Sequence, residues 1–183
     1  EELSSVNIDK SFVNDLGQGD SLKEYALSVY PIAGNTEKDF IRKYFDKKDP
    51  EADVLKRFLY VFWSARDQFD PESEFLKYQQ QVDYVNSIYG TSIKKGYETD
   101  RGRVYLQYGK PNTIFKRPHD PNKYPYEIWH FYDAIKRANG RFVFYNRDMV
   151  TNDYELLHSD VYGEVNQPRW QYLLEQRTEE IND

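Results

Sequence analysis

The spacing of apolar residues changes once along this chain, close to residue 110, and that change limits the folds it can adopt. Before it, apolar side chains recur at steps of three and four, as in Leu55, Phe58, Leu59, Phe62 and Trp63, which is typical of amphipathic helices. After it, short aromatic and aliphatic runs are separated by turn residues, which is typical of strands. The pattern predicts an α+β fold with a helical N-terminal half.

Four helices are predicted in the N-terminal half from their start and stop signals. Asp49-Pro50 and Asp70-Pro71 are start signals, because proline suits the first helical turn and aspartate can accept hydrogen bonds from the free amides ahead of it. The predicted helices begin at Ser21, at Thr36, after Asp49 and after Asp70, and end before Pro31, before Asp46, near Gln68 and at Gly90. Because a short turn joins the last two, they are expected to form an antiparallel hairpin.

The second half of the sequence is expected to form a short helix, a sheet and a final helix. Three runs have the composition of strands, Tyr126–Tyr132, Arg141–Tyr145 and Tyr154–His158, with turn residues that include Asn139-Gly140. The stretch Gln167–Arg177 predicts a helix. The expected fold is α+β, with a helix hairpin, a short motif helix, a three-stranded antiparallel β-meander and a C-terminal helix.

Length and composition fit one globular domain preceded by a tether. The chain has 183 residues, of which 39% are hydrophobic and 17% aromatic, so it can bury a sizeable core. Residues 1–20 lack a sustained apolar period and are expected to pack weakly, with 21–183 forming a single domain. The net charge of −6 argues against capture of nucleic acid or of an anionic membrane as the main function.

The sequence also restricts the chemistry of any site. It has no cysteine, which excludes disulfides, thiolate zinc sites and thiol nucleophiles. The longest apolar run, 58–63, is far shorter than a bilayer span. We therefore expect membrane association only through a leader or lipid anchor outside this chain.

The three histidines predict neither a metal site nor a catalytic one. His119, His130 and His158 fall in different predicted elements and lack metal-ligand spacing. His158-Ser159-Asp160 contains the residue types of a hydrolase triad, but neighbours on a strand point to opposite faces and cannot converge. We therefore predict no metal, no cofactor and no catalytic residue.

Two further groups of residues have a structural and a functional interpretation. The aromatic strands could form core or a stacking platform for RNA or sugar, and bulky groups on both of their faces favour core. A basic concentration could be a solvated face paired with the surplus acids or a site for an anion or partner, and we favour the former. The basic residues are Lys94, Lys95, Arg101, Arg103, Lys110, Lys116 and Arg117.

The segment 96–111 concentrates residues with special backbone roles, namely Gly96, Tyr97, Thr99, Asp100, Gly102, Gly109 and Pro111. Its first two glycines permit unusual angles or close approach of another backbone, and the tyrosine can anchor the segment on the core. Thr99 or Asp100 can cap a short helix, which the last glycine and the proline end. These features predict a segment that ties helices to the sheet.

Arg101 and Arg103, in the same segment, also have two interpretations. They can pair internally with acids such as Glu98, Asp67 or Glu127, or present a fork of donors to the carboxylates of a partner. We favour the internal role, because caps, glycines and an aromatic anchor together are what a difficult chain crossing requires.

The run Gly96-Tyr-Glu-Thr-Asp-Arg-Gly-Arg-Val-Tyr105, followed by Tyr108-Gly-Lys-Pro-Asn112, closely resembles the motif of the GWxTD domain, a family common in Bacteroidota. Tyr97 stands where the family name has tryptophan, which keeps the packing role and loses an indole donor. Further segments resemble family motifs in the same order, so the resemblance covers roughly residues 30–172. They are Phe62-Trp63 with Arg66-Asp67, Tyr126-Glu-Ile-Trp129 and Tyr154–Ser159.

The resemblance implies an exported or lipid-anchored protein, periplasmic or associated with the outer membrane, with protein partners in the envelope, and it transfers no catalytic residue. A weaker architectural similarity links the helix ending in Gly-x-Pro and the aromatic strands to BamE/SmpA-type outer-membrane lipoproteins. We therefore expect a non-enzymatic protein-interaction scaffold of the bacterial cell envelope, such as a subunit of an outer-membrane assembly or secretion complex. The motif residues and Trp129 would have structural or partner-binding roles.

Two alternatives stay open at this point. A hydrolase or glycan-processing enzyme would use Glu98 or Asp100 as acid or base beside the motif helix, with the arginines holding an anionic group. A glycan-binding module would instead need exposed, coplanar rings at Trp129, Tyr132 and Tyr145.

Overall fold

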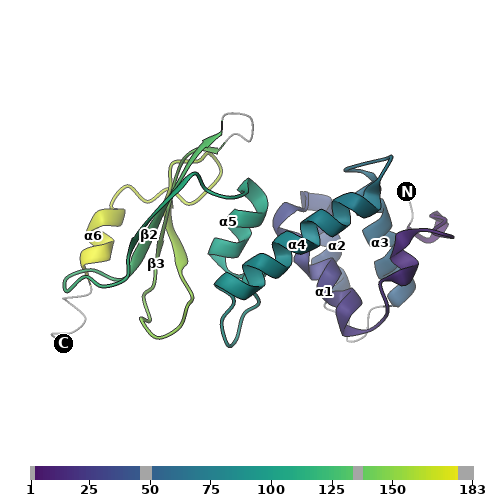
Figure 1. Cartoon of the computed structure of the whole chain (residues 1–183), viewed down its shortest axis with the longest axis horizontal. Coiled ribbons are helices and arrows are strands. Elements are labelled where there is room, and N and C mark those ends of the chain that lie inside the picture. The colour runs from purple at the N-terminus through teal and green to yellow at the C-terminus, as the bar shows by residue number, and fades with distance from the viewer. Residues whose placement is uncertain (1–2, 46–50, 134–137, 177–183) are drawn as a thin grey trace. The chain divides into compact units, whose positions relative to one another are not determined.

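The computed structural model confirms the α+β class, with helices in the N-terminal half, an antiparallel sheet and a C-terminal helix (Figure 1). It describes residues 3–45, 51–133 and 138–176. The chain divides into two compact units, 1–83 and 84–183, whose boundary falls within helix α4. The expectation of one domain over 21–183 stays a prediction.

The first unit is built from helices and short 3-10 turns. Its elements are η1 (Leu3–Ser5), η2 (Phe12–Asp15), α1 (Asp20–Ser28), η3 (Tyr30–Ile32), α2 (Asn35–Phe45), α3 (Ala52–Ser64) and the first part of α4 (Pro71–Tyr89). The predicted start at Asp70 is confirmed, because its carboxylate accepts a hydrogen bond from the Ser73 amide at 3.0 Å. The signal Asp49-Pro50 lies outside the described residues.

Helix α3 ends at Ser64, earlier than the predicted Gln68. The reason is a turn built on Asp67, whose carboxylate accepts hydrogen bonds from the amides of Phe69 and Asp70. Across this turn Trp63 contacts the rings of Phe75 and Tyr78 in α4.

Two residues of the segment before α1 are buried. Val13 is fully buried and Ile8 nearly so, although residues 1–20 show no helical or strand period. Val13 lies in the short 3-10 turn η2 and Ile8 lies between η1 and η2, so the two buried positions leave no periodic pattern in the sequence. The expectation that residues 1–20 form a weakly packed tether stays a prediction.

The second unit contains a four-stranded antiparallel sheet in the order β1-β2-β3-β4. The strands are β1 (Thr113–Arg117), β2 (Tyr126–Asp133), β3 (Ala138–Tyr145) and β4 (Glu155–Ser159), and the helical elements are η4 (Gly96–Glu98), α5 (Asp100–Tyr108) and α6 (Trp170–Glu175). The prediction of three strands was wrong because β1 lies at an edge with all five residues exposed. Such a strand shows no alternation of buried and exposed positions.

Asn139-Gly140 was also misplaced as a turn, since both residues pair with β2 inside β3. A Cβ on Gly140 would lie 3.2 Å from a methyl carbon of Val161, so the glycine serves close packing. The connection between β2 and β3 falls in 134–137, outside the described residues.

Both faces of the sheet carry buried side chains, and most of the large aromatic ones lie on one face. Trp129, Phe131, Phe142 and Phe144 are buried on it, and the end of α4 and helix α5 contact it through Tyr89 and Tyr108. On the other face, α6 packs against His158 through Trp170. The core interpretation of these strands is confirmed for Trp129, so it cannot form an exposed platform, whereas Tyr132 is exposed. Among the described residues no helix is long and apolar enough to span a bilayer.

Candidate functional site

Two glycines bring three stretches of backbone into contact at the start of the motif. A Cβ on Gly96 would lie less than 3.0 Å from the carbonyl of Val85 in α4. A Cβ on Gly102 in α5 would lie less than 3.0 Å from the carbonyl of Gly96. Side chains do not tolerate such contacts with backbone, so the α4–η4–α5 stacking requires glycine at both positions.

Thr99 and Asp100, the two candidate caps, have separate tasks. The Thr99 hydroxyl accepts from the Gly102 amide at 3.1 Å and donates to the Gly96 carbonyl at 2.7 Å, so Thr99 is the cap of α5. The Asp100 carboxylate accepts from the Leu156 amide at 2.6 Å. Together they tie the start of α5 to η4 on one side and to β4 on the other.

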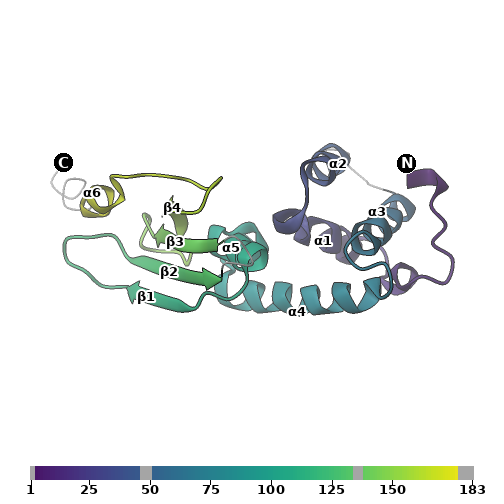
Figure 2. The ribbon, with the colours of Figure 1, turned by 90° about the horizontal axis from the view of Figure 1, so that it is seen from above.

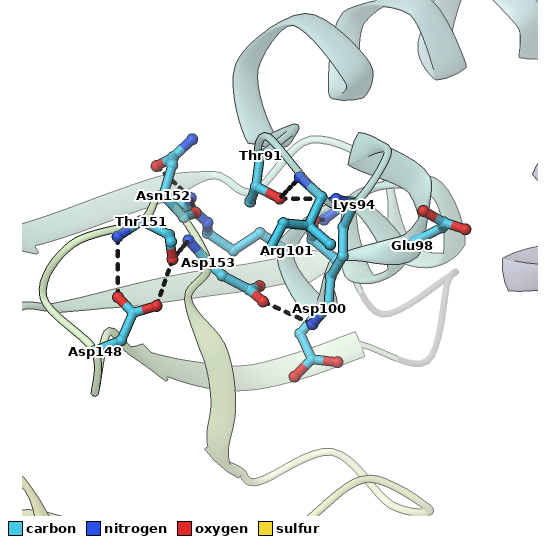
Figure 3. A network of polar contacts seen from close by, with 12 residues as sticks. Thr91, Lys94, Glu98, Asp100, Arg101, Asp148, Thr151, Asn152 and Asp153 are labelled. Carbon is cyan, nitrogen blue, oxygen red and sulfur yellow. Dashed lines mark hydrogen bonds and ion pairs between the residues drawn. The ribbon is translucent and has the colours of Figure 1, made fainter.

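Arg101 lies at the centre of the site and is only 4% exposed. Its Nη1 is 3.1 Å from Glu127 Oε1, and its Nη2 donates to the backbone and side-chain oxygens of Asn152 (Figure 3). The guanidinium carbon lies 4.2 Å from the ring centre of Tyr154 and 5.0 Å from that of Tyr89. Burial raises the pKa of both tyrosines.

Glu127, the partner of Arg101, is one of the three acids that the sequence suggested. Its other oxygen accepts from the indole of Trp129 at 2.9 Å, and Lys116 Nζ lies 3.4 Å from Oε1. Its side chain is 6% exposed. A carboxylate so deeply buried needs these donors, because burying an unpaired charge is costly.

The loop between β3 and β4, residues 146–154, is the part of the site that sequence reasoning missed. Asn152 in this loop accepts from Arg101 and donates to the Ile88 carbonyl at the end of α4 at 3.0 Å. Lys94 pairs with Asp153 at 2.6 Å (Figure 3). A polar loop residue 51 positions from Arg101 gives no spacing signal that could have identified it.

Arg103 forms a second ion pair nearer the surface. It meets both oxygens of Glu164 at 2.8 Å, and the Tyr108 hydroxyl donates to Glu164 at the same distance. Burial alone would lower the pKa of Arg103, but the hydrogen bonds and charge of Glu164 raise it. Burial, assisted by the bond to Glu164, raises the pKa of Tyr108.

The remaining predicted site residues are structural in their contacts. Tyr97 is buried, and its amide donates to Asn86 Oδ1 at 3.3 Å. Glu98 accepts from the Lys95 amide at 2.7 Å. Gly109 has φ +85° and ends α5, after which Pro111 is buried.

His158, Ser159 and Asp160, which have the residue types of a hydrolase triad, make contacts within the fold. His158 and Asp160 lie two positions apart, on the same face, and do approach to 3.1 Å, against the expectation that no members converge. The Ser159 hydroxyl instead donates to the Arg141 carbonyl at 2.8 Å, and His158 Nδ1 accepts from the Gln167 amide. The hydrogen bond from Arg141 lowers the pKa of Asp160.

The chemistry that this site can perform is therefore the fixing of chain segments. The carboxylates of Glu98 and Asp100 both accept backbone amides, and both arginines are paired. A hollow of about 460 Å³ lies away from the motif, between the loop 118–125 and Met149. Among the described residues no cluster of His, Asp and Glu is able to hold a metal ion.

Fold and site together define an α+β domain in which a short motif helix is fixed to an antiparallel sheet by a buried arginine–glutamate pair. The model of the GWxTD domain matches residues 48–176, and the chain belongs to this family. Searches of the curated proteins and of the solved structures find no match, so the similarity to BamE/SmpA-type lipoproteins is unconfirmed.

Proposed function

We propose that this protein is a non-enzymatic interaction scaffold of the bacterial cell envelope, acting as a subunit of an outer-membrane assembly or secretion complex. The observation that carries the proposal is that the polar side chains of the motif bind other segments of their own chain. Asp100, Arg101 and Arg103 are each bonded to their own chain, so the motif builds a framework. This use of its polar groups supports a role in which the framework acts through the surfaces that it holds in place.

The same contacts weigh against the hydrolase expectation. A general acid or base must reach the proton that it transfers, whereas Glu98 and Asp100 are occupied by backbone amides. An arginine that holds a substrate anion must face the substrate, and Arg101 is enclosed by Glu127 and two tyrosine rings. The placement in the envelope, including a periplasmic or outer-membrane location, rests on what membership of the GWxTD family implies.

The test is chemical cross-linking of the full-length precursor in its native membranes, followed by purification under denaturing conditions. We expect a companion protein in a reproducible ratio, because a scaffold needs one. A variant with Gly102→Ala, which disturbs the framework, should lose the companion, whereas Gly34→Ala should keep it. Turnover of any substrate that disappears in a folded Asp100→Ala variant would contradict the proposal.

A further inference from the structure

The two edges of the sheet differ in how their backbone groups are used. At the β4 edge, the Leu156 amide donates to Asp100 at 2.6 Å and the Ser159 amide donates to the Val165 carbonyl at 2.7 Å. Strand β1 lies at the other edge of the sheet (Figure 2). Within the part of the chain that the structure describes, no hydrogen bond from outside the sheet reaches its residues. An edge strand directs alternate N–H and C=O groups outward, so β1 offers them unpaired.

The side chains of β1 give this edge an apolar surface on both sides. Ile114 is 40% and Phe115 is 42% exposed. Ile114 pairs in register with Trp129 on the core face, and Phe115 contacts the ring of Tyr126 on the opposite face. A strand added beside β1 would cover both residues with its own alternating side chains.

The charge of the edge specifies the added strand further. Residues 109–119 contain Lys110, Lys116 and Arg117 and no acid, in a chain of net charge −6. Lys116 lies 3.4 Å from Glu127 but keeps 58% of its side chain exposed. Arg117 lies over the ring of Phe115 and pairs with no carboxylate of a described residue. A strand with carboxylates complements this edge.

We propose that β1 is a docking edge for an extended segment of another protein, in which two neighbouring apolar residues lie beside Ile114 and Phe115 and two neighbouring acidic residues lie beside Lys116 and Arg117. The inference deepens the proposed function and rests on it. Pro111 and Pro118 flank the five residues of β1 and limit the segment to a similar length. A second copy fits poorly, because its own β1 segment contains no acidic residue to complement Lys116 and Arg117.

A displayed library of random ten-residue peptides, selected on the purified chain, tests the proposal. We expect selected peptides to carry two neighbouring acidic residues next to two neighbouring apolar ones, and N-methylation of every second residue to weaken binding at least tenfold. Lys116→Glu with Arg117→Glu should weaken it similarly, whereas the matched reversals Lys77→Glu with Arg169→Glu should not. If the double variant fails to fold, Arg117→Glu alone can be tested, because Arg117 pairs with no carboxylate of a described residue and its replacement breaks no ion pair.

Other outcomes of the selection overturn the proposal. The proposal fails if the selected peptides lack an acidic bias or if their binding survives N-methylation. It also fails if no peptide slows hydrogen exchange in β1, or if the chain dimerises through β1. A photo-cross-linker at Phe115 or at exposed Val150, placed in the full-length protein in cells, separates this failure from that of the proposed function. Capture of a protein by the cross-linker at Phe115, mapped to an acidic extended segment, supports the docking edge. Capture at Val150 alone overturns the docking edge but leaves the proposed scaffold function. Capture at neither position contradicts both the docking edge and the scaffold function.

Discussion

Arg101 and Arg103 lie two residues apart on one short helix, and each pairs with a glutamate, yet they occupy different environments. Arg101 and Glu127 are 4% and 6% exposed, whereas Arg103 is 30% exposed and its partner Glu164 is 9% exposed. Arg103 adds only a bond to Gln107 on its own helix. Arg101 reaches strand β2 and the loop 146–154.

The difference shows that the contribution of an ion pair to stability depends on which segments it joins and on how well it is shielded from water. Water can replace part of what Arg103 supplies to Glu164, because their pair lies near the surface. Less water can replace what Arg101 supplies to Glu127, because both side chains of that pair are buried. Asn152 would lose both of its guanidinium contacts at the same time.

Arg101→Met should produce the largest loss in the motif. It leaves Glu127 buried without its main cation, and removal of one partner of a buried pair typically destabilises by about 3–5 kcal/mol. Urea unfolding measures the loss. Adding Glu127→Gln should recover part of it, because the amide removes the unpaired charge and can still accept from Trp129. A loss below about 1 kcal/mol would mean that the buried pair carries little of the fold.

Gly102→Ala, between the two arginines, should have the next largest effect. Its methyl group would collide with the carbonyl of Gly96, and forcing extra volume into packed surroundings costs about 1–3 kcal/mol. Because α5 must move to relieve the collision, the Arg101 contacts should suffer more than those of Arg103. The matched control is Gly34→Ala, whose nearest neighbour would be a side-chain oxygen at 3.6 Å. Equal losses in the two variants would refute the backbone stacking argument.

Arg103→Met should destabilise less than either change, by about 1–2 kcal/mol, since hydrogen bonds to a charged partner are lost at a partly exposed site. A double-mutant cycle with Glu164→Gln isolates the pair. Raising the salt concentration from about 0.1 M to about 1 M should reduce this coupling energy but leave that of Arg101 with Glu127 nearly unchanged. If both couplings respond alike, the difference in solvent access does not separate the two pairs.

Much of the fold could be predicted because its signals are local. The Asp70-Pro71 start, the Gly90 stop and the aromatic strand around Trp129 each depend on neighbours in sequence. Strand β1 could not be found this way, because its only partner is β2 and its exposed side chains carry no alternation. Gly140 was wrongly assigned to a turn, because glycine is required both in turns and where a strand packs closely against another segment.

The site was predictable in its residues and only partly in its contacts. Thr99 as a cap follows from local chemistry, and Glu127 was one of three acids considered for the arginines. The choice of Glu127 depends on the sheet register, and that of Asn152 and Glu164 on loops far along the chain. Such partners follow from tertiary packing, which one sequence does not encode as spacing.

Tyr108→Phe tests the Arg103 side of the comparison and should have the smallest effect, about 0.5–1 kcal/mol at neutral pH, because Glu164 keeps Arg103 when the hydroxyl is lost. Burial, with the bond to Glu164, raises the pKa of Tyr108 above its ordinary value of 10.0. The hydroxyl's contribution is therefore full below pH 10 and is lost as the pH rises further, since the unfolded chain ionises first. Urea unfolding of both proteins should show the advantage of Tyr108 shrinking above pH 10. A constant advantage would mean that the hydroxyl ionises as readily in the folded protein as in the unfolded chain.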